Sequence, residues 1–115
     1  MKYMLLIHSG DGVWARFNGL GEEEQRAILG EYLAIAEEPG VMAGHQLQPA
    51  DTATTVRVED GRTLTTDGPF IEAKEELGGY FLYEADNLDA AIELAGRIPA
   101  ARMGGAIEVR PVVER

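Results

Sequence analysis

Apolar residues fill both alternating sets of positions in the first segment of the chain. Every position from Tyr3 to Ile7 is apolar, so both faces of an extended segment here would be largely apolar. This pattern predicts a central β-strand over residues 2–8, covered on one side and partly on the other.

The apolar period then changes to that of a helix. Between Glu22 and Glu38 apolar residues recur at helical spacing, with Ile28, Tyr32 and Ile35 as the main series. Glutamates 22–24 suit the positive end of a helix dipole, and Pro39-Gly40 ends the pattern. A second strand is predicted over Val41–Gln46.

A hairpin is predicted next. The β-branched runs Thr54–Val58 and Arg62–Thr65 flank Asp60-Gly61, a strong type I′ turn signal that places Glu59 opposite Arg62.

The second half of the chain repeats the order strand, helix, strand. Residues 80–85 form an apolar strand, and Asp86 or Asn87 caps a helix that Pro99 stops. Residues 106–113 form the closing strand. The apolar face of this helix is expected to comprise Leu88, Ala91, Ile92 and Ala95.

This order predicts an α+β fold: a ferredoxin-like split βαβ protomer with an inserted β-hairpin and both helices on one face of the sheet. No linker, repeat or low-complexity tract interrupts residues 1–115, which we expect to form a single domain. The other face would expose apolar side chains, either Met4 and Leu6 or Phe81 and Tyr83. We therefore expect a homodimer.

Composition limits the classes of molecule that the protein is expected to bind. The net charge of −10 opposes binding to nucleic acid, and the absence of cysteine removes disulfides and thiolate metal sites. The apolar run at the N-terminus is too short to span a bilayer and lacks a signal-peptide cleavage site. We expect a cytoplasmic protein without a membrane partner.

Several separated blocks resemble the DGPF-type branch of the YCII-related proteins. The blocks are Asp67-Gly68-Pro69-Phe70 with Glu72, Lys74-Glu75 and Gly78-Gly79-Tyr80 after it, residues 1–7, and Val109-Arg110-Pro111-Val112. The resemblance implies a dimeric α+β barrel of ferredoxin-like protomers, in proteins that are usually small, bacterial and cytoplasmic. It implies no settled reaction.

The resemblance to the broader YCII-related group also implies an acid/base pair, a histidine from the first helix with an aspartate after the second. This chain has no histidine between Phe17 and Gly44 and no aspartate after Asp89. Any chemistry must therefore use other residues.

Asp67 is the first candidate catalytic residue. Its carboxylate could act as a general base, or it could accept hydrogen bonds from its own turn. Pro69 disfavours helical geometry at Gly68 and pushes it toward an extended conformation. Glu72 and Lys74 are candidate ligand-binding residues. They could clamp a small anion, or they could simply form a salt bridge in an exposed loop.

His8 and His45 are the only histidines and the other candidate catalytic residues. His8 ends the first strand near Asp11, and His45 follows Gly44, which allows close approach of a ligand. Neither has metal-ligand spacing, so no metal is expected.

Five aromatic residues could line an apolar cavity for a ligand or pack in a dimer core: Trp14, Phe17, Tyr32, Tyr80 and Tyr83. Of these, Trp14 and Tyr80 are the candidate ligand-binding residues. Trp14 lies in the connector from Gly10 to Gly21, where an aromatic on a loop could cover a pocket mouth. The glycines of this connector match no phosphate-binding pattern, so no cofactor is expected.

Together these observations predict a homodimeric DGPF/YCII-type protein with a small-molecule pocket near Asp67 and the strand ends. They leave open whether it is a lyase-like enzyme. The alternative is a non-catalytic binding or regulatory module in which the Asp67 corner is structural.

Overall fold

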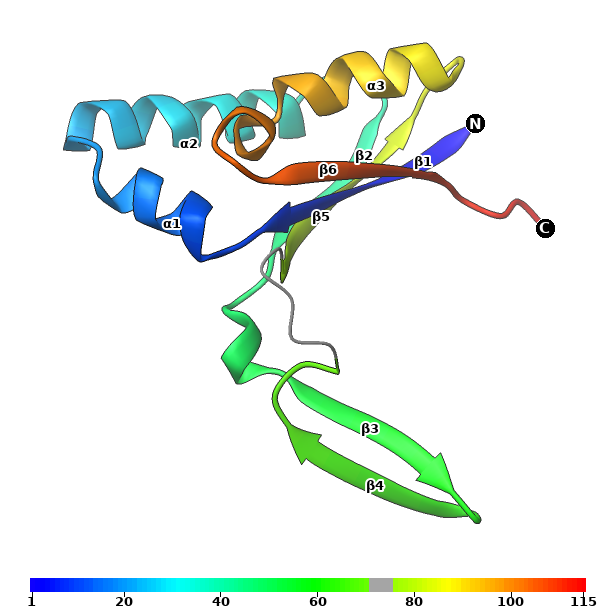
Figure 1. The fold of residues 1–115 in the computed structure, drawn as a ribbon. Helices are drawn as coiled ribbons and strands as arrows, with labels where there is room; N and C mark the ends of the chain where they lie inside the picture. Colours follow the sequence, from blue (N-terminus) through cyan, green and yellow to red (C-terminus); the bar gives the residue numbers. More distant parts are fainter. Residues whose placement is uncertain (71–75) are drawn as a thin grey trace.

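A four-stranded antiparallel sheet forms the centre of the computed structural model, which describes residues 1–70 and 76–115 (Figure 1). Its order is β2-β5-β1-β6. The strands are β1 (Lys2–Ser9), β2 (Val41–Gln46), β3 (Thr54–Glu59), β4 (Arg62–Asp67), β5 (Glu76–Glu84) and β6 (Ala106–Pro111), and the helices are α1 (Asp11–Asn18), α2 (Glu22–Ala36) and α3 (Leu88–Arg97). Short 3-10 turns cover Ala50–Thr52 and Pro99–Arg102.

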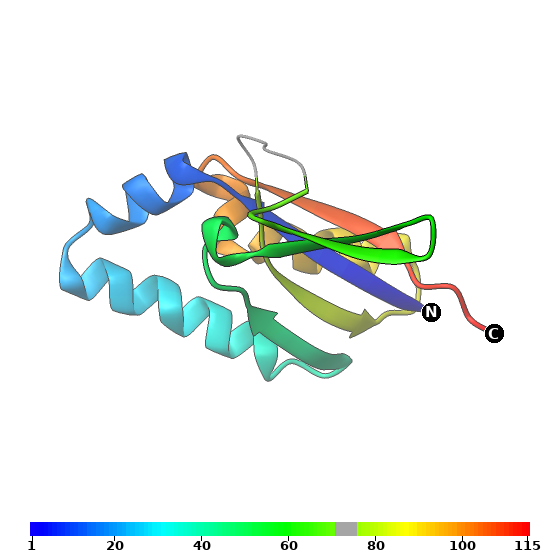
Figure 2. The same ribbon diagram turned by 90° about the horizontal axis from the view of Figure 1, so that it is seen from below.

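The helices and the hairpin lie on opposite sides of this sheet. Figure 1 shows α2 and α3 above the strands and the β3–β4 hairpin below them, and Figure 2 shows the hairpin in front of the sheet when seen from below. With β3 and β4 set aside, the strand order is that of a ferredoxin-like split βαβ unit. The predicted α+β fold with an inserted hairpin is confirmed.

The pairing register decides which side chains meet the helices. Leu5 lies opposite Phe81, and Tyr3 lies opposite Tyr83, and all four belong to the core or pack against it. Because side chains alternate along a strand, Met4 and the residues in its series point to the face without helices. This open face carries Met4, Leu6 and His8 of β1, Tyr80 and Leu82 of β5, and Glu108 and Arg110 of β6.

Helix α1 corrects the expectation that residues 10–21 form a loop. The carbonyl of Gly10 accepts hydrogen bonds from the amides of Val13 and Trp14, which starts the helix. Val13 is buried in the core, so it packs this short helix against the sheet. Trp14 therefore lies on a helix and not on a loop.

The buried face of α3 also differs from the predicted one. Ala91, Leu94 and Ala95 are buried, whereas Leu88 and Ile92 are about half exposed. The helix is rotated so that Leu94, rather than Ile92, packs onto the sheet. The cap is as predicted, since the Asn87 side chain accepts a hydrogen bond of 2.9 Å from the amide of Ala90.

The β3–β4 hairpin has the predicted turn and register. Asp60 and Gly61 have φ values of 51° and 75°, as a type I′ turn requires, and Glu59 pairs with Arg62. The two strands form a sheet of their own and leave Val56 and Val58 exposed. The radius of gyration is 16.0 Å, against about 13 Å for a compact domain of this length.

Ion pairs hold α2 beside the C-terminal half of the chain. Arg97 donates to both carboxylate oxygens of Glu38 at 2.7 and 2.8 Å, and also to Glu93. These hydrogen bonds raise the pKa of the Arg97 guanidinium. Arg102 contacts Glu31 of α2 at 2.5 Å, so the two pairs link α2 and the residues just after it to the C-terminal half of the chain.

Among the described residues, no helix combines the length and apolar character needed to cross a membrane.

Candidate functional site

A cavity of about 480 Å³ lies where α1 and α2 meet the helix-facing side of the sheet. Its lining is dominated by aliphatic and aromatic side chains. They are Ile7, Val13, Trp14, Phe17, Ile28, Leu29, Tyr32, Leu33, Phe81 and Met103, with Ser9, His45, Gln46, Tyr80 and three glycines at the sheet. Such a lining suits an apolar guest.

Two glycines allow the sheet to pack closely at this cavity. A Cβ on Gly44 would lie 2.4 Å from the Phe81 ring, so only glycine leaves room for the ring against β2. A Cβ on Gly79 would lie 2.8 Å from the carbonyl oxygen of His45, which is part of the backbone of the neighbouring strand. The cavity therefore meets bare backbone at its base.

Aromatic rings form the wall from α1 and α2. Trp14 and Phe17 make an edge-to-face pair, with their ring centroids 6.3 Å apart. Tyr32 stands across from them on α2, and its partial burial raises the pKa of its phenol. Trp14 is 40% exposed, so its indole reaches the solvent side of the cavity.

His45 and Tyr80 form a polar pair beside the cavity. The distance between Nδ1 of His45 and the Tyr80 hydroxyl is 2.9 Å, and the two residues are directly paired across β2 and β5. The register places Gly44 and Phe81 on the helix-facing side of the sheet. Because side chains alternate along a strand, His45 and Tyr80 direct their side chains to the open face. The cavity meets the strand at His45, while the imidazole faces away from it.

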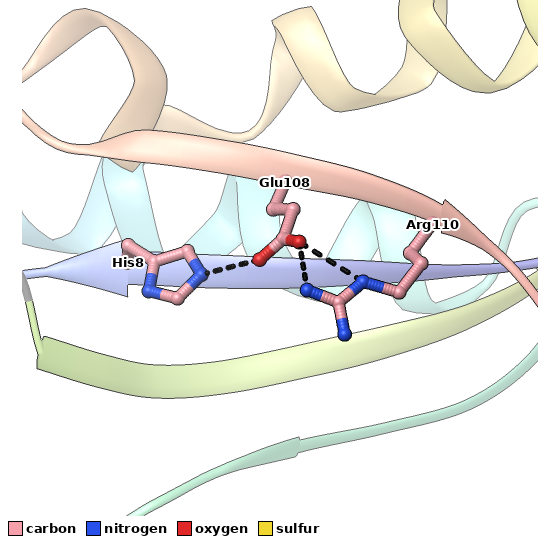
Figure 3. A network of polar contacts seen from close by, with 3 residues as sticks. All are labelled: His8, Glu108 and Arg110. Atoms are coloured by element: carbon pink, nitrogen blue, oxygen red, sulfur yellow. Dashed lines mark hydrogen bonds and ion pairs between the residues drawn. The ribbon is translucent and has the colours of Figure 1, made fainter.

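His8 belongs to a separate polar network on the open face. Its Nε2 lies 3.1 Å from Oε1 of Glu108, and the guanidinium of Arg110 donates to the other carboxylate oxygen (Figure 3). Arg110, and then His8, lower the pKa of the Glu108 carboxyl below its ordinary value. His8 and His45 thus share a face of the sheet but have different partners.

Asp67 is not a member of either histidine pair. It ends β4 opposite Thr54 and is not among the residues that line the cavity. Within the described residues its carboxylate makes no hydrogen bond or ion pair. The corner is held instead by the Gly68 amide, which donates to the Ala53 carbonyl at 2.7 Å, and by the Thr55 hydroxyl, which donates to the Gly68 carbonyl.

Gly68 has a φ of +101°, so the corner uses the left-handed region and not the extended geometry that Pro69 led us to expect. Phe70 packs under the guanidinium of Arg57, which lies 4.5 Å from the ring centroid. Glu72 and Lys74 lie outside the described residues.

Four of the aromatic residues that the sequence suggested as cavity lining border the cavity, namely Trp14, Phe17, Tyr32 and Tyr80, whereas its aliphatic lining was not predicted. Ile28, Leu29 and Leu33 carried a usable signal, since they belong to the helical series on α2. Phe81 and Met103 carried none, because their approach to the cavity depends on the packed fold.

Two comparisons place the chain among known proteins. A family model described as the YCII-related domain matches residues 1–115. An uncharacterised protein of Rhizobium meliloti (strain 1021) is 31% identical over 118 residues, an alignment that covers 97% of this chain and 92% of the relative. The chain therefore belongs to the YCII-related family.

Proposed function

We propose that the protein binds a small apolar molecule in the cavity between α1, α2 and the sheet, and that it acts as a homodimer. The observation that carries this proposal is the cavity of about 480 Å³ with its aromatic and aliphatic lining. Ligand sites in proteins commonly have volumes of about 300–1,000 Å³ and a mainly apolar lining. The site lies on the helix side of the sheet and away from Asp67.

Trp14 offers a direct test of binding because it is the only tryptophan of the chain. N-phenyl-1-naphthylamine, a neutral apolar fluorophore, is expected to quench Trp14 emission by energy transfer and to gain fluorescence itself. Leu29→Arg, at a half-exposed wall position, places a cation against the guest and is expected to weaken binding at least tenfold.

Leu88→Arg is the matched control, since Leu88 is 48% exposed against 50% for Leu29 and lies outside the cavity. This variant should bind the fluorophore like the unmodified protein. Saturable binding that Leu29→Arg leaves unchanged would show that the fluorophore occupies another place and would refute the proposal.

The open face of the sheet supports the homodimer. Met4, Leu6 and Leu82 lie there without a helix to cover them. The hairpin, whose Val56 and Val58 are exposed, lies on the same side of the sheet (Figure 1). A second copy would remove this apolar area from water. The face-to-face arrangement of two sheets as an α+β barrel, the DGPF branch and a cytoplasmic location remain predictions.

Sedimentation velocity at micromolar concentration tests the dimer. The unmodified protein should sediment as a dimer, and Leu6→Asp should shift it to the monomer because a carboxylate would be buried between the sheets. Ile92→Asp, on the exposed side of α3, should remain dimeric. A monomeric unmodified protein at this concentration would exclude the proposed assembly.

Catalytic roles for Asp67, His8 and His45 stay predictions. The proposed function needs none of them, and it is closest to the non-catalytic binding module that the sequence left open. The His45–Tyr80 pair is the arrangement on which a proton-transfer activity would most simply rest, because a phenol and an imidazole in hydrogen-bond contact can exchange a proton.

A further inference from the structure

A second cavity adjoins the apolar one. It has a volume of about 550 Å³ and shares Ser9, Trp14, Gln46 and Gly78 with the first cavity. Its other lining residues are Leu47, Gln48, Pro49, Ala50, Glu76 and Leu77. The shared residues make the two spaces neighbouring compartments, with the Trp14 indole at their junction.

The two compartments differ in chemistry. The first is bounded mainly by aliphatic and aromatic side chains from α1, α2 and the sheet, whereas the second combines apolar side chains such as Leu47 and Leu77 with amide, hydroxyl and carboxylate groups. Glu76 pairs with Ser9 at the ends of β5 and β1, so the two side chains lie on the same side of the sheet. A guest that extends through both compartments would therefore meet an apolar region and then a polar one.

Among the described residues that line the second compartment, the ionic group is a carboxylate. Of the described residues that line either cavity, Glu76 is the sole carboxylate, and none is a lysine or an arginine. Within the described part of the chain, Glu76 makes no hydrogen bond or ion pair through its side chain. The net charge of −10 adds a general field that attracts cations and repels anions.

We propose that the joined cavities bind a cationic amphiphile, with its apolar body in the first compartment and an ammonium head group in the second. This inference rests on the proposed binding function and adds the ligand's chemical class. Glu76 pairs with the ammonium group, Gln46 and Gln48 offer amide oxygens to its N–H groups, and the Trp14 ring provides a face for a cation.

Octylammonium and octanoate provide matched probes, since they share an eight-carbon length and differ in the sign of the head group. Binding is followed by the emission of Trp14 and by displacement of N-phenyl-1-naphthylamine. Octylammonium is expected to bind at least roughly tenfold more tightly than octanoate at neutral pH and low salt.

Glu76→Gln is expected to bring the affinity for octylammonium close to that for octanoate, which removes most of this preference. Glu84→Gln is the control, because it removes the same charge from the opposite end of β5, outside both cavities. It should retain the preference, which separates the local effect of Glu76 from that of total charge.

The outcomes distinguish the two proposals. If the fluorophore binds but octanoate binds as tightly as octylammonium, or if Glu76→Gln and Glu84→Gln act alike, the cationic ligand class is wrong and the apolar site stands. If octylammonium fails to displace a bound fluorophore, the ligand class is also wrong. If neither the fluorophore nor the octyl compounds bind, the proposed function itself fails.

Discussion

Replacing Leu94 by alanine is expected to lower the free energy of unfolding by about 3 kcal/mol. Leu94 is fully buried on the face of α3 that packs on the sheet, so truncation loses apolar contact and leaves a void. In a domain of this size the melting temperature should fall by roughly 10–15 °C. Urea denaturation and thermal melting, both followed by circular dichroism, measure the change.

Ile92→Ala is the control on the same helix. Ile92 is 51% exposed, so its truncation should cost less than about 1 kcal/mol. A larger loss for Ile92→Ala than for Leu94→Ala would mean that α3 packs through the face predicted from its apolar spacing and not through Leu94. All variants should be compared at one protomer concentration, because dimerisation would contribute to stability.

Gly105→Ala is the second substitution with a large expected effect, a loss of about 2–3 kcal/mol through overpacking. A Cβ at this position would lie 2.6 Å from the His8 carbonyl oxygen and 3.1 Å from that of Ala100. Both obstacles are backbone atoms, so β6 would have to move away from β1. The expected result is a lower urea midpoint with an unchanged denaturant slope.

Gly30→Ala should have the opposite effect. Gly30 lies within α2, and a Cβ there would contact nothing within 4 Å. Alanine restricts the unfolded chain and favours the helix, so stability should rise by about 0.5–1 kcal/mol.

A Gly105→Ala protein as stable as the unmodified one would contradict the first of these two predictions, because it would show that β6 has room to shift at this point.

The hairpin and the second strand could be predicted from the sequence because their signals are local, whereas β5 begins at Glu76, four residues before the strand predicted over residues 80–85. The Asp60-Gly61 turn sets its own φ values and fixes which residues pair across it. The second strand was predicted with the bounds Val41–Gln46 that the structure shows, between the Pro39-Gly40 stop and a polar segment. These elements depend little on distant residues.

Elements whose position depends on packing were predicted less well. The rotation of α3 follows from how Leu94 fits the sheet. Helix α1 has only eight residues and is flanked by glycines, which favours a loop, although Val13, Trp14 and Phe17 lie at helical spacing. The candidate site predicted near Asp67 differs from the observed cavity for the same reason. Asp67 carried the clearest motif, but the cavity forms where Trp14 and Tyr32 meet β2 and β5, which no local pattern reveals.

The place of β1 in the sheet has a consequence for the order of folding. This strand occupies residues 2–9, yet both of its neighbours, β5 and β6, come from residues 76–84 and 106–111. During synthesis β1 has no partner until more than half of the chain has emerged, and its apolar side chains stay uncovered meanwhile. Pairings this distant in sequence slow the search for the native topology. The hairpin, by contrast, can close as soon as its own residues are made.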